Sequence, residues 1–110
     1  FICDVPLANA LVEACRGLDC KIYTGIVVSG DQFISSNQKR RQLSRDFNAN
    51  ACEMEGAAIG HVCVRNKVPF CVLRSVSDNI DNNQTVDFDK FKHAAAEKAT
   101  NIILKMLKAI

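Results

Sequence analysis

Two glutamates lie close together in a stretch that is otherwise small and apolar. Residues 50–60 read NACEMEGAAIG, and only Met54 separates Glu53 from Glu55. A carboxylate is costly to bury without a partner. The pair therefore indicates either an exposed surface or a binding site whose contents satisfy the two charges.

The flanking segments predict the elements that would position this pair. Pro6 suits the first turn of a helix that ends at Gly17, and Asn37 can cap a short basic helix that ends near Phe47. A third helix is expected over 55–66 and a fourth after Asp87, which can cap it. The buried side of the fourth helix is expected to carry Phe88, Phe91, Ala95, Ile102, Ile103 and Met106.

Strands are expected between these helices, over 21–29, 49–53 and 68–76, where β-branched and apolar residues predominate. The resulting order α-β-α-β-α-β-α predicts an α/β fold, layered α/β/α around a central mixed, partly parallel sheet. Ligands of such sheets bind beyond the carboxyl ends of the strands. Three segments are expected there: 29–34, 53–55 and 77–78.

Composition and charge exclude several classes of protein. The chain has 110 residues, 48% of them hydrophobic and 24% charged, which is typical of a soluble globular domain. A net charge of +2 does not indicate a nucleic-acid partner, and no apolar run reaches the length of about 20 residues that spans a bilayer. No signal peptide opens the chain, so we expect a cytoplasmic protein. Because residue 1 is Phe1 and not Met, we expect the sequence to begin inside a longer protein.

The basic residues, cysteines and histidines each allow a structural and a functional interpretation. The cluster at helical spacing is expected to form a solvated helix face, with an anion-binding patch as the alternative; it comprises Lys39, Arg40, Arg41 and Arg45. The six cysteines include no CxxC pair, so buried free thiols are favoured over disulfides or a metal site. His61 and His93 are expected on helix faces without metal-ligand partners.

Four stretches together resemble the purine nucleoside phosphorylase and nucleosidase superfamily, and within it the 5'-methylthioadenosine/S-adenosylhomocysteine nucleosidases. They read VVSGDQFI (27–34), ACEMEGAAIGHVC (51–63), VPFCVLRSVSDNID (68–81) and VDFDKF (86–91). Each is weak alone, but the four occur in the order and near the spacing of the family. The resemblance implies that residues 1–110 are the C-terminal half of a single nucleosidase domain whose N-terminal half is absent.

The activity implied by this resemblance is hydrolysis of the N-glycosidic bond between adenine and ribose, as in methionine salvage. A general acid that protonates N7 would let adenine leave as a neutral molecule. Asp78 matches that acid, and Ser77 could orient it by a hydrogen bond. Partial burial after an apolar strand would raise the pKa of Asp78 toward neutrality. The alternative is that Asp78 only begins the turn SDN.

The two glutamates match family positions with different roles. Glu55 matches the residue that accepts hydrogen bonds from the ribose 2'- and 3'-hydroxyls, which would satisfy its charge. Glu53 is expected to support the site from behind, and Met54 to lie against the nucleoside. A capped helix start and ordinary core packing remain equally good interpretations of Glu53 and Met54.

The remaining substrate contacts implied by the resemblance come from Phe33, Ile34 and Phe88. Phe33 matches the aromatic residue that stacks on adenine, and the backbone of Ile34 matches the group that binds the base edge. Both could instead anchor a loop to the core. Phe88 matches a wall of the 5'-alkylthio pocket, with a core role as the alternative.

Several expectations concern the whole enzyme. In this family the glutamate that activates water lies in the N-terminal half of the domain, which is absent here, so no residue is assigned that role. The 110 residues alone are therefore expected to be inactive. The resemblance implies no cofactor and no metal, a nucleoside substrate, and a homodimer without nucleic-acid or membrane partners. Two alternatives stay open: a purine nucleoside phosphorylase that uses phosphate instead of water, and a non-catalytic storage-type relative.

Overall fold

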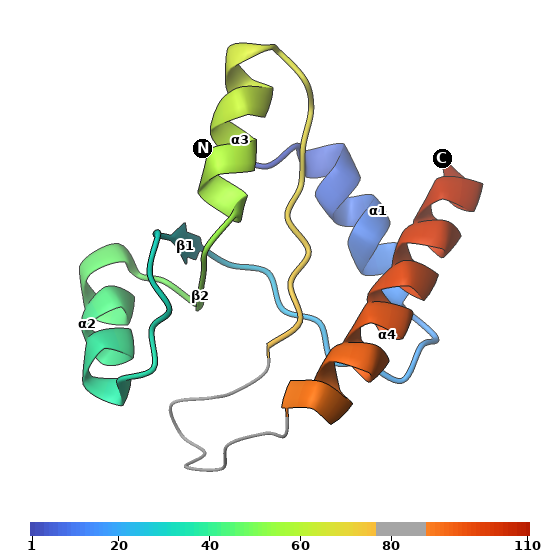
Figure 1. The fold of residues 1–110 in the computed structure, drawn as a ribbon. Helices are drawn as coiled ribbons and strands as arrows, with labels where there is room; N and C mark the ends of the chain where they lie inside the picture. Colours follow the sequence, from blue (N-terminus) through green and yellow to red (C-terminus); the bar gives the residue numbers. More distant parts are fainter. Residues whose placement is uncertain (77–87) are drawn as a thin grey trace. The chain divides into compact units, whose positions relative to one another are not determined.

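The computed structural model describes residues 1–76 and 88–110, and the side chain of Phe88 lies outside that description. Its elements are α1 (Val5–Cys15), β1 (Val27–Ser29), α2 (Asn37–Phe47), β2 (Ala51–Glu53), α3 (Gly56–Arg65) and α4 (Phe88–Ala109) (Figure 1). The chain divides into two units. The first unit comprises Phe1–Ile2 and Tyr23–Phe70, and the second comprises Cys3–Ile22 and Cys71–Ile110.

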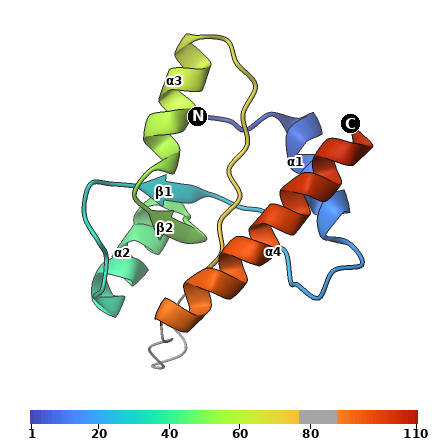
Figure 2. The ribbon, with the colours of Figure 1, turned by 45° about the vertical axis from the view of Figure 1, so that its right-hand side comes forward.

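The first unit contains a parallel pair of strands joined through a helix. β1 pairs with β2 in the register Val27↔Ala51, Val28↔Cys52 and Ser29↔Glu53, and α2 lies between them in the sequence. The two arrows lie side by side in Figure 2, where α3 packs against β1 and α2 against β2. Parallel strands need such a crossover, so the predicted α/β fold class with parallel pairing is confirmed.

The strands are shorter and fewer than the sequence predicts. Pairing covers only 27–29 of the expected strand 21–29, and only 51–53 of the expected strand 49–53. The prediction of a strand over 68–76 is wrong, since none of these residues belongs to a strand in the described chain. β propensity favours an extended backbone, but a strand also requires a neighbouring backbone with which to pair.

The helices follow their predicted bounds closely, and side-chain caps mark the starts of α1 and α2. Asp4 caps α1 by accepting a hydrogen bond from the Leu7 N–H at 3.0 Å. The Ser36 hydroxyl caps α2 by accepting from the Lys39 N–H at 3.3 Å, so the expectation that Asn37 is the cap is wrong by one residue. The predicted cap of α4, Asp87, lies outside the described residues.

The second unit is built on the packing of α1 against α4 (Figure 1). Its buried side chains are Leu11, Ala14, Cys15 and Ile102. Lys105 Nζ donates to the Arg16 carbonyl at 2.6 Å, which satisfies a carbonyl at the end of α1.

The buried side of α4 agrees with the prediction at most positions. Phe91, Ala95 and Met106 are half-buried and Ile102 is buried, but Ile103 is 41% exposed, so its predicted burial is wrong. Ala99 is half-buried and continues the same face. The 3.6-residue period of the helix places position 99, and not position 103, in line with 95, 102 and 106.

The other side chains singled out in the sequence have mostly structural settings. All six cysteines are free thiols, as predicted, but only Cys15 is buried and the other five are half-buried. His61 and His93 are exposed on α3 and α4, which confirms their helix-face interpretation, and the His61 ring stacks on Phe1 with centroids 5.1 Å apart. A helix long and apolar enough to cross a membrane does not occur within residues 1–76 and 88–110.

Candidate functional site

The parallel register brings two of the predicted site segments to one edge of the sheet. Ser29 and Glu53 are paired as the last residues of β1 and β2, and the Gly30 N–H donates to the Glu53 carbonyl at 3.2 Å. Ligands of parallel sheets bind beyond this end of the strands. The predicted placement of segments 29–34 and 53–55 at strand ends is therefore confirmed.

The Glu53 carboxylate is held by hydrogen-bond donors of the protein itself. It accepts from the Ser29 hydroxyl, from the Glu55 N–H at 3.0 Å, and from the Gly56 N–H at 2.9 and 2.8 Å to its two oxygens. Its negative charge also lies at the N-terminus of α3, where the helix dipole stabilises it. Glu53 thus fixes the start of this helix, the structural role considered for it in the sequence.

Ser29 links three elements through one hydroxyl group. The hydroxyl donates to Glu53 and accepts from the Ala57 N–H at 2.9 Å, so it joins the end of β1 to the first turn of α3. The sequence alone predicts no role for the Ser29 hydroxyl. The available signal was a hydroxyl residue at the end of one predicted strand and a carboxylate at the end of another.

Gly56 makes this arrangement possible because it has no side chain. A Cβ atom on Gly56 would lie 2.7 Å from Glu53 Oε1, closer than real Cβ contacts allow. Gly60, one turn further along α3, is buried, and a Cβ there would lie 2.9 Å from Phe70 Cε2. The small residues of α3 were expected to allow close packing on a sheet, and at Gly60 that close packing is against the Phe70 ring.

Glu55 and Met54 lie at the same edge and are more exposed than Glu53. Glu55 is the N-cap residue of α3, and its carbonyl accepts from the Ile59 N–H at 3.2 Å. Its side chain makes no capping hydrogen bond within the described chain. Met54 is 41% exposed. The Glu53 carboxylate therefore holds the start of the helix, and Glu55 is the more exposed of the two glutamates.

The loop from β1 to α2 presents an aromatic side chain. Phe33 is 76% exposed, so the alternative that it anchors the loop in a core is wrong for the described residues. Ile34 is half-buried, and its carbonyl accepts two hydrogen bonds from the Arg40 guanidinium. The predicted solvated face holds for the exposed Lys39, Arg41 and Arg45, but it is wrong for Arg40, which is half-buried.

Three predicted site residues have side chains outside the described part of the chain. Ser77 and Asp78 lie outside the described residues. Phe88 is the first residue of α4, and its side chain is not described. Their predicted contacts with substrate stay predictions.

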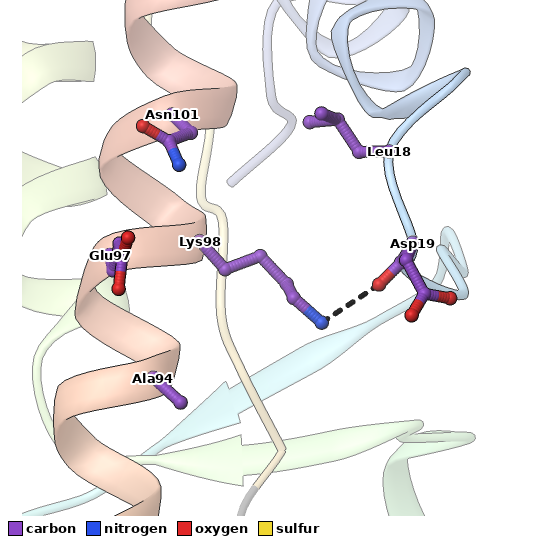
Figure 3. Close-up of a pocket in the computed structure, with 6 residues that line it drawn as sticks. All are labelled: Leu18, Asp19, Ala94, Glu97, Lys98 and Asn101. Carbon is purple, nitrogen blue, oxygen red and sulfur yellow. Dashed lines mark hydrogen bonds between the residues drawn. The ribbon is translucent and has the colours of Figure 1, made fainter.

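A surface pocket of about 290 Å³ lies in the second unit, away from these motifs in the sequence. It is lined by Leu18, Asp19, Ala94, Glu97, Lys98 and Asn101 (Figure 3). The Lys98 side chain crosses it and donates to the Asp19 carbonyl at 2.9 Å. Because this contact uses the lysine to tie α4 to the loop after α1, the pocket has the features of a structural junction.

The chain is similar to a known family over nearly its whole length. Residues 1–108 match the model of the phosphorylase superfamily. The aminodeoxyfutalosine nucleosidase of Campylobacter jejuni is 38% identical over 107 residues, which cover 97% of this chain and 47% of that protein. The 5'-methylthioadenosine/S-adenosylhomocysteine nucleosidase of Shewanella loihica is 38% identical over 110 residues, covering 98% of this chain and 48% of that protein.

Solved structures show the same relationship. The crystal structure of a 5'-methylthioadenosine/S-adenosylhomocysteine nucleosidase from Campylobacter jejuni matches with a TM-score of 0.90 and 38% identity, over 98% of this chain and 47% of that one. The nucleoside phosphorylase-like fold expected from the sequence is thereby confirmed. The chain spans about half the length of the curated relatives that it matches.

Proposed function

We propose that this chain, which belongs to the phosphorylase superfamily, is part of an N-glycosyl hydrolase. The proposed substrates are 5'-methylthioadenosine and S-adenosylhomocysteine, and adenine is the released product. The relatives named 5'-methylthioadenosine/S-adenosylhomocysteine nucleosidase, together with the four motifs of the sequence, support a hydrolase over a phosphorylase.

The observation that carries the proposal is the difference in hydrogen bonding and exposure between Glu53 and Glu55. Glu53 is occupied by Ser29 and by the backbone N–H groups of Glu55 and Gly56. Its charge therefore serves the fold. Glu55, two residues later, is the N-cap residue of α3, and its side chain is exposed beside an exposed Met54. A carboxylate next to an apolar side chain at a strand end suits a sugar, whose hydroxyls donate and whose ring faces are apolar.

In the proposed mechanism this edge binds the ribose and the base. Glu55 accepts the 2'- and 3'-hydroxyl hydrogen bonds, and its charge stabilises the positive charge that builds on the sugar. Phe33 stacks on adenine, and the Ile34 backbone binds the base edge. Met54 lies against the nucleoside, and Phe88 forms a wall for the 5' substituent.

The bond-breaking step is assigned to residues after the apolar segment 68–76. Asp78 donates a proton to N7, so adenine departs neutral, and Ser77 orients the Asp78 carboxyl group. Water then attacks the sugar. The group that activates this water is assigned to a part of the protein outside residues 1–110, as the resemblance implies.

A second substrate has specific support. Two relatives, at 38% and 41% identity, are named aminodeoxyfutalosine nucleosidase. The adenine-releasing chemistry and the roles of Glu55 and Asp78 are proposed to be the same for either substrate. Comparing kcat/KM for aminodeoxyfutalosine with kcat/KM for methylthioadenosine distinguishes the two activities.

The complete protein is further proposed to work as a cytoplasmic homodimer in methionine salvage. The family resemblance supports these finer statements, and the small net charge of +2 agrees with a nucleoside substrate in place of nucleic acid. Light scattering of the purified full-length protein tests the dimer, since a monomeric mass would contradict it.

The test of the activity is product analysis with the full-length protein in phosphate buffer. Adenine and free ribose derivatives are expected, whereas ribose 1-phosphate derivatives would identify a phosphorylase. Asp78→Asn should lower kcat by about 10² to 10⁴, the usual contribution of a general acid. Turnover within threefold of the unsubstituted protein would remove Asp78 from this role, and no turnover by the unsubstituted protein would favour the storage-type alternative.

A further inference from the structure

Arg40 makes a contact that its three basic neighbours do not share. Its guanidinium donates to the Ile34 carbonyl through Nε at 3.1 Å and through Nη2 at 2.9 Å. Nη1 donates to Asn37 Oδ1 at 3.3 Å. One side chain of α2 is thus fixed to the loop before it and to the first residue of its own helix.

This geometry is suited to holding a loop in one conformation. Two N–H groups of the positively charged guanidinium donate to one carbonyl oxygen. Hydrogen bonds from a charged donor are stronger than neutral ones, and a pair of them fixes the orientation of the two groups. The planar guanidinium also loses little entropy for each bond that it forms. Because Arg40 is half-buried, water competes less for its hydrogen bonds than it would at an exposed position such as that of Arg41.

The loop that Arg40 holds presents two groups assigned to the base. Phe33 is 76% exposed, so protein packing does little to fix its ring. The Ile34 carbonyl is bound to Arg40, which constrains the peptide that follows Ile34 and, through it, the backbone beside Phe33. The structure therefore fixes the backbone of this loop by a charged side chain and leaves the aromatic ring accessible.

We propose that Arg40 is a positioning residue for base binding, which holds the Phe33–Ile34 backbone in the conformation that receives adenine. This inference rests on the proposed function, because it takes the loop as the base site. Arg40 contributes by lowering the cost of ordering the loop on binding, so its loss weakens binding more than it slows the chemical step.

The experiment compares Arg40→Gln with Arg41→Gln in the full-length protein. Arg41 lies on the same helix, carries the same charge and is exposed, so its substitution controls for net charge and helix propensity. We expect the Kd for free adenine, measured by calorimetry, to rise about tenfold in Arg40→Gln and to stay within twofold in Arg41→Gln. KM for methylthioadenosine should rise with the Kd while kcat stays within threefold.

Two further variants test the geometry. Arg40→Lys keeps the charge but cannot form the two-nitrogen contact, so it should recover only part of the lost affinity. Asn37→Ala removes the acceptor of Nη1 and should produce a smaller increase in Kd. Amide hydrogen exchange at 33–35 should be faster in Arg40→Gln than in Arg41→Gln.

The outcomes separate this inference from the proposed function. An unsubstituted protein that neither binds nor releases adenine overturns both. Adenine binding that is equal in Arg40→Gln and the unsubstituted protein overturns only the role of Arg40, whatever the exchange rates. If Arg40→Gln does not fold, Arg40→Lys and Asn37→Ala decide: unchanged adenine affinity in both would also overturn the role.

Discussion

Two regions of the molecule are stabilised by different forces. One is the edge where β1 and β2 end and α3 begins, and the other is the pair of helices α1 and α4. At the edge, Glu53 and Ser29 make polar contacts with backbone N–H groups, and Gly60 is the only buried residue of the first unit's described chain. The helix pair instead buries Leu11, Ala14, Cys15 and Ile102 around apolar contacts. The edge proposed to bind the ribose and the base is therefore arranged by hydrogen bonds, and the helix pair by apolar packing.

This difference predicts which property a substitution in each region should change. Apolar burial is nondirectional and supplies stability in proportion to area, whereas hydrogen bonds fix orientation at a small net gain in free energy. We therefore expect substitutions in the helix pair to change the free energy of unfolding, and substitutions at the edge to change catalysis. The following predictions test this separation in the full-length protein.

Ile102→Ala should have the largest effect on stability. Ile102 is 5% exposed in the cluster between α1 and α4, so its truncation should cost about 2 to 5 kcal/mol of unfolding free energy by leaving a cavity. Urea denaturation measures this loss. Ile103→Ala is the matched control, because Ile103 is 41% exposed and should cost less than about 1 kcal/mol. Equal losses would contradict the assigned core.

Glu55→Gln should lower kcat/KM by about 10- to 100-fold, since it removes a charged acceptor of the ribose hydroxyls. The melting temperature should hardly change, because Glu55 is exposed at the start of α3. The variant should also discriminate less between a substrate and its 2'-deoxy analogue. An unchanged preference for ribose would place Glu55 outside the sugar site.

Ser29→Ala should have an intermediate effect, of about 1 to 2 kcal/mol, on both kcat/KM and unfolding. It removes the donor to Glu53 and the acceptor of the Ala57 N–H, so the start of α3 is less well fixed. Ser29→Thr keeps the hydroxyl and should preserve most of both quantities. A kcat/KM for Ser29→Ala equal to that of the unsubstituted protein would show that the link is not needed.

The smallest effect should be a loss of stability above about pH 9 that is caused by ionisation of the Cys15 thiol at the end of α1. Burial, followed by the neighbouring Cys20, raises the pKa of the Cys15 thiol above its ordinary value of 9.0. A raised pKa means that the folded state favours the protonated thiol, so its contribution is complete below pH 9 and is lost as the pH rises past it. The unfolding free energy of Cys15→Ala should decline less steeply from pH 8 to about pH 10.

The helices were predictable because their signals are local. Pro6 and Asn37 lie in the first turns of α1 and α2, and Gly17, with φ of +81°, follows the end of α1. A strand was wrongly predicted over 68–76, because strand formation depends on pairing with a second backbone, which a local pattern does not contain. Ile103 was misplaced because adjacent apolar residues leave the direction of a helix face ambiguous.

At the candidate site, too, local features were predictable from the sequence and contacts between distant segments were not. The sequence singled out Glu53 and Glu55, but only the register of β1 with β2 shows that Ser29 meets Glu53 and that backbone donors surround it. Arg40 was grouped with a solvated face because its spacing matches that of its neighbours. Two of its hydrogen bonds go to the main-chain carbonyl of Ile34, a group that every residue carries and that a sequence pattern therefore does not indicate.

The parallel register also limits how this region can change in length. Ser29 is paired with Glu53, and side chains alternate between faces along a strand. One residue inserted within 51–53 would turn Glu53 to the opposite face and separate it from the Ser29 hydroxyl. An insertion within 30–35 would lengthen a loop and leave that pairing in place. A change of chain length therefore separates Ser29 from Glu53 where it falls within a three-residue strand, and leaves their pairing in place where it falls within the loop.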